Sequence, residues 1–197
     1  MRKGEETKDF IVRKSAELFN IRGYTACSLS DIMEETNLKK GGIYNHFKNK
    51  DEIAIAAFDY SYSLVFKRFK TRLSQDATSL DKIHSIIEVF QSFGTNPVVK
   101  GGCPIFNTAI DATGTHSDLK TKAKEAINTL IKYVEIKVEE GKIEGEFKMN
   151  VNAPEFALFL VSTLEGALMV SRVNEKQASL DMAADIIKTY VKNNLVK

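Results

Sequence analysis

The chain has 197 residues, of which 43% are hydrophobic and 27% charged, and its formal net charge is +2. These values are typical of a globular protein with one or two domains and a sizeable core. Residues 1–50 carry ten Lys and Arg against seven Asp and Glu, a balance of +3, whereas the remainder has 18 against 19, a balance of −1. A basic first quarter is compatible with nucleic acid as a partner but does not require it.

The chain start and the two cysteines predict a cytoplasmic protein without a membrane partner. The opening MRKGEETKDF is charged and lacks the apolar core of a secretory signal. Cys27 and Cys103 are far apart and have no partner at metal-ligand spacing, which is typical of a reducing compartment. The longest apolar run, residues 156–170, contains Glu165, and we expect it to be too short to span a bilayer.

Helical periodicity dominates the chain, and no strand or internal repeat is expected. In chain order it predicts a helix that begins by Ile11 and ends at Gly23, then helices over about 28–36, 39–47, 50–73, 79–93, 105–112, 117–140, 154–173 and 178–195. Their ends carry capping residues: Gly23 at a helix C-terminus, Ser28 followed by Asp31, and Asn37 at a break. The fold is therefore predicted to be all-α, with about nine helices.

Two short helices joined by a tight turn after a longer helix predict a helix-turn-helix, whose second helix enters the major groove of DNA. That helix lies in NLKKGGIYNHFKNK, residues 37–50. Its glycines let the backbone approach the phosphates, its lysines supply charge, and Ile43 and Phe47 are placed to anchor it inward. Taken alone, a run of this kind is more often a solvated loop. The predicted DNA-binding residues are Ser28, Lys39, Lys40, Gly41, Gly42, Tyr44, Asn45, His46 and Lys50.

Residues 11–53 as a whole resemble the N-terminal domain of the tetracycline-repressor (TetR/AcrR-type) family. The resemblance is carried by Ala16, Leu18, Phe19, Gly23-Tyr24, Ser28 and Ile32, and then by Gly41, Ile43-Tyr44, His46-Phe47 and Lys50-Asp51. Lys39 departs from the pattern, because the family usually has a small hydroxyl residue at the start of this helix. The resemblance implies a DNA-binding domain over 1–50 and a ligand-binding and dimerisation domain over 51–197. It also implies a repressor that a small molecule releases from a near-palindromic operator.

The later helices carry aromatic residues that are compatible with a pocket for an apolar or aromatic effector, although aromatic residues at helical spacing more often form core. The predicted ligand-binding residues are Phe66, Phe69, Phe90, Phe93, Cys103, Phe106, Asn107, Asp111, Tyr133, Phe159 and Glu165. Cys103 precedes Pro104 at the expected start of a helix, a position that lowers thiol pKa values, so it is either a reactive sensor or a packing residue. We favour packing.

The last two helices have apolar stripes that either pack within the chain or form a four-helix seam between two copies. The resemblance favours the symmetric dimer. The predicted interface residues are Phe156, Leu160, Thr163, Gly166, Ala167, Val170, Ile187, Tyr190 and Val191.

Three other functions stay open at this stage: an activator rather than a repressor, a helical carrier or enzyme that uses the aromatic interior, and a protein-interaction module. No Ser/His/Asp set, phosphate loop or metal cluster is apparent, so we expect no enzyme activity, no metal and no cofactor.

Overall fold

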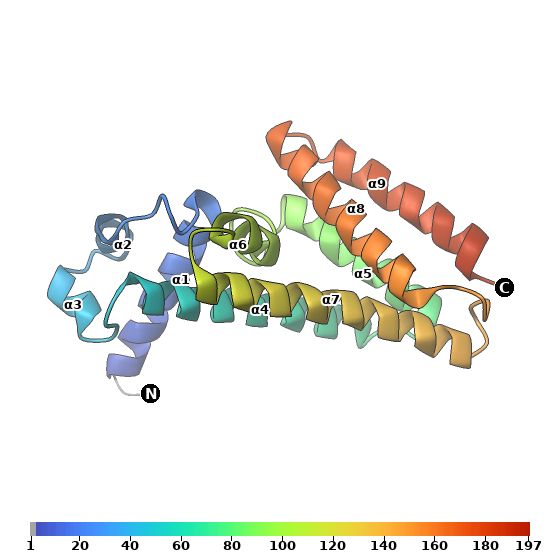
Figure 1. Ribbon diagram of the computed structural model, residues 1–197, viewed down its shortest axis with the longest axis horizontal. Coiled ribbons are helices and arrows are strands. Elements are labelled where there is room, and N and C mark those ends of the chain that lie inside the picture. The colour runs from blue at the N-terminus through green and yellow to red at the C-terminus, as the bar shows by residue number, and fades with distance from the viewer. Residues whose placement is uncertain (1–2) are drawn as a thin grey trace. The chain divides into compact units, whose positions relative to one another are not determined.

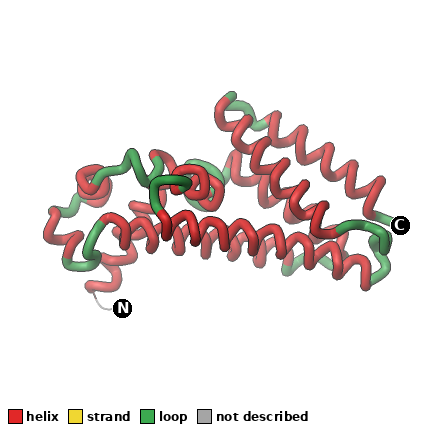
Figure 2. Tube along the Cα trace, in the orientation of Figure 1, coloured by secondary structure: helices red, strands yellow, loops and turns green. Residues whose placement is uncertain are grey.

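The computed structural model describes residues 3–197, and this part of the chain is almost entirely helical (Figures 1 and 2). It contains nine α-helices and a closing π-helical turn, and its one extended pairing is an isolated antiparallel bridge between Phe147 and Val196. The all-α prediction with about nine helices is confirmed. The helices are α1 (Lys3–Arg22), α2 (Leu29–Thr36), α3 (Lys40–Tyr44), α4 (Lys50–Leu73), α5 (Ser79–Thr95), α6 (Pro104–Ala112), α7 (Ser117–Ile143), α8 (Ala153–Val173) and α9 (Ala178–Tyr190), followed by the π-helical turn Val191–Leu195.

The described residues form two compact units. The first unit contains the residues up to Val65 together with Val98–Ala126, and the second contains Phe66–Pro97 and Ile127–Lys197. The long helices α4 and α7 each contribute residues to both units. The first unit is therefore larger than residues 1–50, and the functional division expected after residue 50 stays a prediction.

Local capping signals fix the helix ends of the first unit. Gly23 has a φ of +82° and donates its N–H to the carbonyl of Phe19, so it ends α1 as expected. Ser28 and Asp31 form a reciprocal capping box at the start of α2, which is also as expected. Asn37 adopts the predicted left-handed conformation, with a φ of 54°. These ends place α2 and α3 over a core that includes Ile11, Ile32, Ile43, Phe47 and Ile53.

The second unit is built on α8 and α9, which run side by side, with α5 packed against both (Figure 1). Its interior is rich in aromatic rings; Phe69, Phe90, Phe93 and Phe147 are fully buried. The segment after α7 folds back over the start of α5, where the Glu146 carboxylate accepts the Ser79 and Leu80 N–H groups. This carboxylate satisfies donors that a helix N-terminus otherwise leaves unpaired.

The apolar run of residues 156–170 is part of a longer helix. The helix that contains it, α8, has 21 residues, and an 18-residue window of it reaches a mean hydropathy of 1.6. By length and composition it passes the test for a membrane span among the described residues, a test that core helices of soluble proteins also pass. In the second unit α8 packs against α5 and α9, and packing of this kind accounts for an apolar helix.

Candidate nucleic-acid interface

Helix α3 is shorter than the sequence predicts, with five residues instead of nine. It starts at Lys40, after Lys39 in an extended conformation that provides no side-chain cap, and it ends at Tyr44. The following residues turn tightly, since the N–H of His46 bonds to the carbonyl of Ile43 three residues earlier. Two glycines inside so short a helix weaken it by roughly 1 kcal/mol each relative to alanine, which agrees with its early end.

The two glycines of α3 have different surroundings. A Cβ atom added at Gly41 would meet nothing within 4 Å, whereas one at Gly42 would lie 3.8 Å from Cβ of Leu38. The backbone at Gly41 is therefore bare toward open space. An external surface can approach it more closely than any residue with a side chain would allow.

The side chains of α3 and the turn after it divide into an inner and an outer set. Ile43 and Phe47 are buried, as predicted, and fix the helix to the core. Tyr44 is 41% exposed even though it is a large aromatic residue. The outer, exposed residues are Lys39, Lys40, Gly41, Tyr44, Asn45 and Lys48, and His46 and Gly42 are half-buried beside them.

Lys50 has a different environment from the other lysines of this region. Its Nζ atom donates to the backbone carbonyls of Tyr24 and Cys27, at 2.9 Å each, and lies 4.0 Å from the centre of the Tyr24 ring. These contacts tie the loop between α1 and α2 to the start of α4. The structure thus gives Lys50 an internal role, and its predicted phosphate contact stays untested. Ser28 likewise has its hydroxyl engaged with Asp31 in the capping box.

Tyr24 lies in the loop between α1 and α2, and its side chain makes several contacts besides the one with Lys50. Its hydroxyl donates to Asp51, and the ring of His116 stands edge-on to it with 4.8 Å between ring centres. Burial, reinforced by the hydrogen bond to the Asp51 carboxylate, raises the pKa of Tyr24 to about 12. The tyrosine stays a neutral donor at physiological pH. In the sequence Tyr24 stands out only as part of the family pattern, without a role of its own.

Helix α6 contacts the end of α1 through two side chains that we call the latch, Asp111 and Asn107. Asp111 accepts the N–H of Tyr24 at 2.6 Å and that of Thr25 at 3.4 Å. Asn107 donates to the backbone carbonyl of Asn20 and to that of Gly101. The latch joins the loop that leads into α2 to a helix far along the chain.

Comparisons with known proteins agree with this geometry. A family model described as "Bacterial regulatory proteins, tetR family" matches residues 11–57, and one described as "Tetracyclin repressor-like, C-terminal domain" matches residues 79–187. The crystal structure of a TetR transcriptional regulator from Chloroflexus aurantiacus is similar to this chain, with 38% identity and a TM-score of 0.96 over 100% of this chain and 99% of that one. The chain belongs to the TetR family.

Curated relatives of this TetR-family chain are transcriptional regulators. One is an HTH-type transcriptional regulator in the lacX 3′ region of Lactococcus lactis, 25% identical over 93% of this chain and 92% of its own length. Another is the "Biofilm operon icaADBC HTH-type negative transcriptional regulator IcaR" of Staphylococcus epidermidis, 31% identical over 42% of this chain and 44% of its own length. TetR-family proteins are soluble DNA-binding regulators rather than enzymes, and they bind operators, dimerise and respond to small molecules. This chain is accordingly a helix-turn-helix transcriptional regulator.

The residues predicted to bind a ligand fall into three groups in the structure. Phe69, Phe90 and Phe93 pack ring against ring inside the second unit, with 5.7–6.4 Å between ring centres, and half-buried Phe66 and Tyr133 flank them. Cys103, Phe106, Asn107 and Asp111 belong to the first unit, on α6 or at its start, and Phe159 and Glu165 lie on α8. Three of the rings therefore form core, and the ligand-binding role of the whole set stays a prediction.

Cys103 occupies the N-cap position of α6, with Pro104 in the first turn as expected. Its side chain is buried, and Cys27 is buried as well. Burial, assisted by the charge of Asp31, raises the pKa of the Cys27 thiol to about 11, so this thiol is protonated at neutral pH. The burial of Cys103 agrees with the packing role that we favoured.

The predicted dimer residues on α8 and α9 divide by burial. Leu160, Ile187 and Val191 are completely buried inside the second unit, and Phe156 is nearly so, because these positions face the neighbouring helix of the same chain. They are not available to a second copy. Phe159, Val170 and Tyr190 are exposed, and so are Val173, Met182 and Ile186. Thr163, Gly166 and Ala167 are half-buried, and a Cβ at Gly166 would meet nothing within 4 Å.

A methyl group added at Gly23 should displace Asp111 and weaken the hydrogen bonds that it accepts from Tyr24 and Thr25. A Cβ there would lie 2.8 Å from Oδ1 of Asp111, and the positive φ of Gly23 adds backbone strain. We expect Gly23→Ala to destabilise the first unit by about 2 kcal/mol and to speed amide hydrogen exchange at Tyr24 and Thr25. Gly114→Ala is the matched control, because Gly114 has a φ of +84° and no atom within 4 Å of an added Cβ. Equal effects of the two substitutions would contradict the latch.

Proposed function

We propose that this regulator is a cytoplasmic repressor that binds a near-palindromic operator as a homodimer and leaves it when a small molecule binds. The observation that carries the proposal is the exposed surface of α3. Lysines, hydrogen-bonding side chains and the bare backbone of Gly41 share this surface, while Ile43 and Phe47 hold the helix from within. Such a surface presents both phosphate-binding charge and groups that can reach base edges.

The roles within this surface follow from chemistry. Lys39 and Lys40 are exposed and flank the helix start, so we assign them to phosphates. Asn45 is exposed at the end of α3, and its amide can both donate to and accept from a base edge, so we assign it to sequence discrimination. Tyr44 and His46 provide further donors beside it. Lys50 stabilises this surface indirectly, because it binds two backbone carbonyls of the loop between α1 and α2.

Repression, rather than activation, is supported by the relative IcaR, which is named a negative transcriptional regulator. Release by an effector is supported by membership of a family whose proteins respond to small molecules. For the effector we keep an apolar or aromatic molecule as the first candidate. Within the aromatic cluster of the second unit, Phe66 and Tyr133 are half-buried, so a ligand can reach them with less rearrangement than the buried rings of Phe69, Phe90 and Phe93 would need.

Salt dependence tests the assignment of the lysines. The wild type should select one family of sequences from a random duplex pool, with affinity that falls steeply as salt rises. Lys39→Ala and Lys40→Ala should each weaken binding to all sequences alike and reduce the slope of log affinity against log salt by about 0.9, because each removes one phosphate contact. Fluorescence anisotropy at several salt concentrations measures both quantities.

Two further variants complete this test. Lys192→Ala removes an exposed lysine from the C-terminal end of the chain and should leave the slope unchanged. Asn45→Ala should change which bases are preferred, by about 1–3 kcal/mol at the contacted position, with little change in the slope. The regulator proposal fails if the wild type selects no sequence from the pool.

A further inference from the structure

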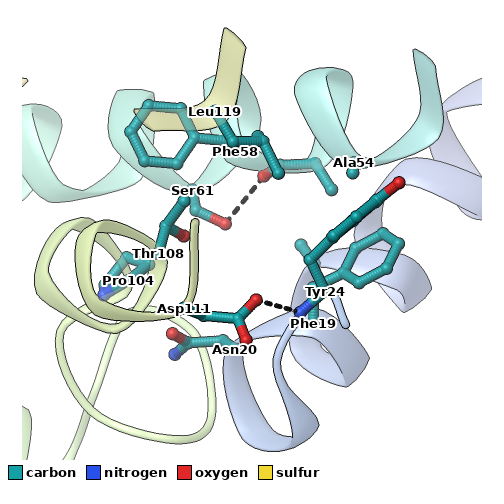
Figure 3. Close-up of a pocket in the computed structure, with 12 residues that line it drawn as sticks. Phe19, Asn20, Tyr24, Ala54, Phe58, Ser61, Pro104, Thr108, Asp111 and Leu119 are labelled. Atoms are coloured by element: carbon teal, nitrogen blue, oxygen red, sulfur yellow. Dashed lines mark hydrogen bonds between the residues drawn. The ribbon is translucent and has the colours of Figure 1, made fainter. Parts of the chain in front are cut away.

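The first unit contains a small cavity lined by residues of α1, α4, α6 and the start of α7, and Asp111 of the latch is part of its wall (Figure 3). It is partly open to solvent and holds about 30 Å³ of space that water can enter, room for about two water molecules. A group of two or three non-hydrogen atoms fits this space without rearrangement.

The lining of the cavity combines aromatic rings with one carboxylate. Phe19, Tyr24 and Phe58 line it, and Asp111 reaches into it from α6 toward the backbone nitrogen of Tyr24 (Figure 3). Asn20, Ser61 and Thr108 complete the polar part of the lining. No Lys, Arg or His is among the described residues that line the cavity, so no cation of the lining offsets the charge of Asp111.

This composition selects for positive charge. An anion would be repelled by the Asp111 carboxylate, and a neutral donor would gain a hydrogen bond to it but no attraction between opposite charges. An ammonium group is attracted both to the carboxylate and to the faces of neighbouring rings. Nζ of Lys50 already lies 4.0 Å from the centre of the Tyr24 ring and takes one of its faces, so Phe19 and Phe58 are the main rings for the ligand.

We propose that this cavity is a binding site for a small organic ammonium ion. The ligand would be held by Asp111 and the surrounding rings. The site is in the first unit, and Asp111 is one of the residues that the sequence assigned to ligand binding.

A ligand in this cavity would also change the affinity for DNA. This consequence rests on the proposed function. The carboxylate that would hold the ammonium group is the one that accepts the N–H groups of Tyr24 and Thr25. An ion in the cavity competes with these backbone donors for Asp111 and therefore acts on the loop that leads into α2. Occupancy should lower operator affinity.

Calorimetric titration of the full chain with methylammonium chloride tests the site without any DNA. We expect saturable binding at millimolar concentration, against no saturable heat with sodium chloride at the same ionic strength or with methanol, a neutral molecule of equal size. Asp111→Asn should weaken methylammonium at least about tenfold, because it removes the charge but keeps an oxygen that can accept the Tyr24 N–H. Asp59→Asn is the matched control, since Asp59 is an exposed carboxylate on α4 that pairs with Lys122, and it should bind as the wild type does.

A second variant separates the site from the integrity of the latch. Phe58→Leu keeps Asp111 and its hydrogen bonds but removes one ring, and it should weaken methylammonium about threefold or more. Absence of saturable binding to the wild type, or equal affinity in wild type and Asp111→Asn, would overturn the proposal. Methylammonium binding by a chain that selects no DNA sequence would support the site while removing the regulatory role.

Discussion

Replacing Gly141 by alanine should lower the free energy of unfolding by about 2 kcal/mol, although alanine favours a helix over glycine by about 1 kcal/mol. A Cβ at this position of α7 would lie 2.5 Å from Cε2 of Phe147 and 2.9 Å from Cβ of Ser79, closer than real Cβ atoms approach other heavy atoms. Both neighbours are fully buried. Neither can withdraw easily, because the backbone N–H of Phe147 bonds to the Gly141 carbonyl and the Ser79 hydroxyl donates to Glu144.

Urea denaturation at a fixed protein concentration measures this loss, since the stability of a dimer depends on concentration. A double-mutant cycle with Phe147→Leu identifies the cause. The smaller side chain should relieve the overlap, so Gly141→Ala should cost less in that background by about 1 kcal/mol. If the cost of Gly141→Ala is the same in both backgrounds, the ring of Phe147 is not what the added methyl group meets.

Features of the fold that depend on a few neighbouring residues could be predicted from the sequence. Ser28 and Asp31 lie three positions apart, and their capping box needs only a local helix start. Asn37 and Gly23 end helices through their own backbone conformations. The inward anchors Ile43 and Phe47 follow from a spacing of four residues. In each case the physical cause lies within one or two helical turns, so the sequence contains all of it.

Features that depend on residues far apart in the chain could not be predicted in this way. Ile186 and Ile187 are adjacent and equally apolar, yet Ile186 is 61% exposed and Ile187 is buried. Which of them faces the interior depends on where α5 and α8 lie, and residue type alone does not encode this. The latch is a similar case, because Asp111 meets the Tyr24 backbone across 87 positions.

For Lys50 the position along the chain could be predicted, but its contacts could not. The sequence places it correctly at the start of α4, next to basic and aromatic residues that suggest a phosphate contact. The structure directs its ammonium group to two loop carbonyls and the Tyr24 ring. Backbone carbonyls leave no trace in a residue pattern, so a cation that stabilises a loop and a cation that binds phosphate look the same in sequence. The exposed Lys39 and Lys40 are therefore the better test of DNA contact.

The apolar surface that stays exposed on α8 and α9 leads to the prediction with the largest expected effect on function. Met182 and Ile186 are 65% and 61% exposed on one side of α9. Tyr190, one turn further along that side, packs against Phe159 of α8 with 5.3 Å between ring centres. An apolar face of this kind, together with Gly166, where an added Cβ would meet nothing within 4 Å, suits the close approach of the same two helices from a second copy.

Ile186→Glu should convert the dimer to monomers at micromolar concentration and weaken operator binding at least about a hundredfold. Two-fold symmetry places the new carboxylate in the interface twice, where burying an unpaired charge is costly, and a lone monomer loses the gain from holding two half-sites at once. The substitution should not unfold the chain, because the side chain is mostly exposed within it. Ile143→Glu is the control: Ile143 is 84% exposed at the end of α7, and the same charge there should leave assembly and DNA binding unchanged. Light scattering and anisotropy measure both properties, and an Ile186→Glu protein that stays dimeric with wild-type affinity would place the interface elsewhere.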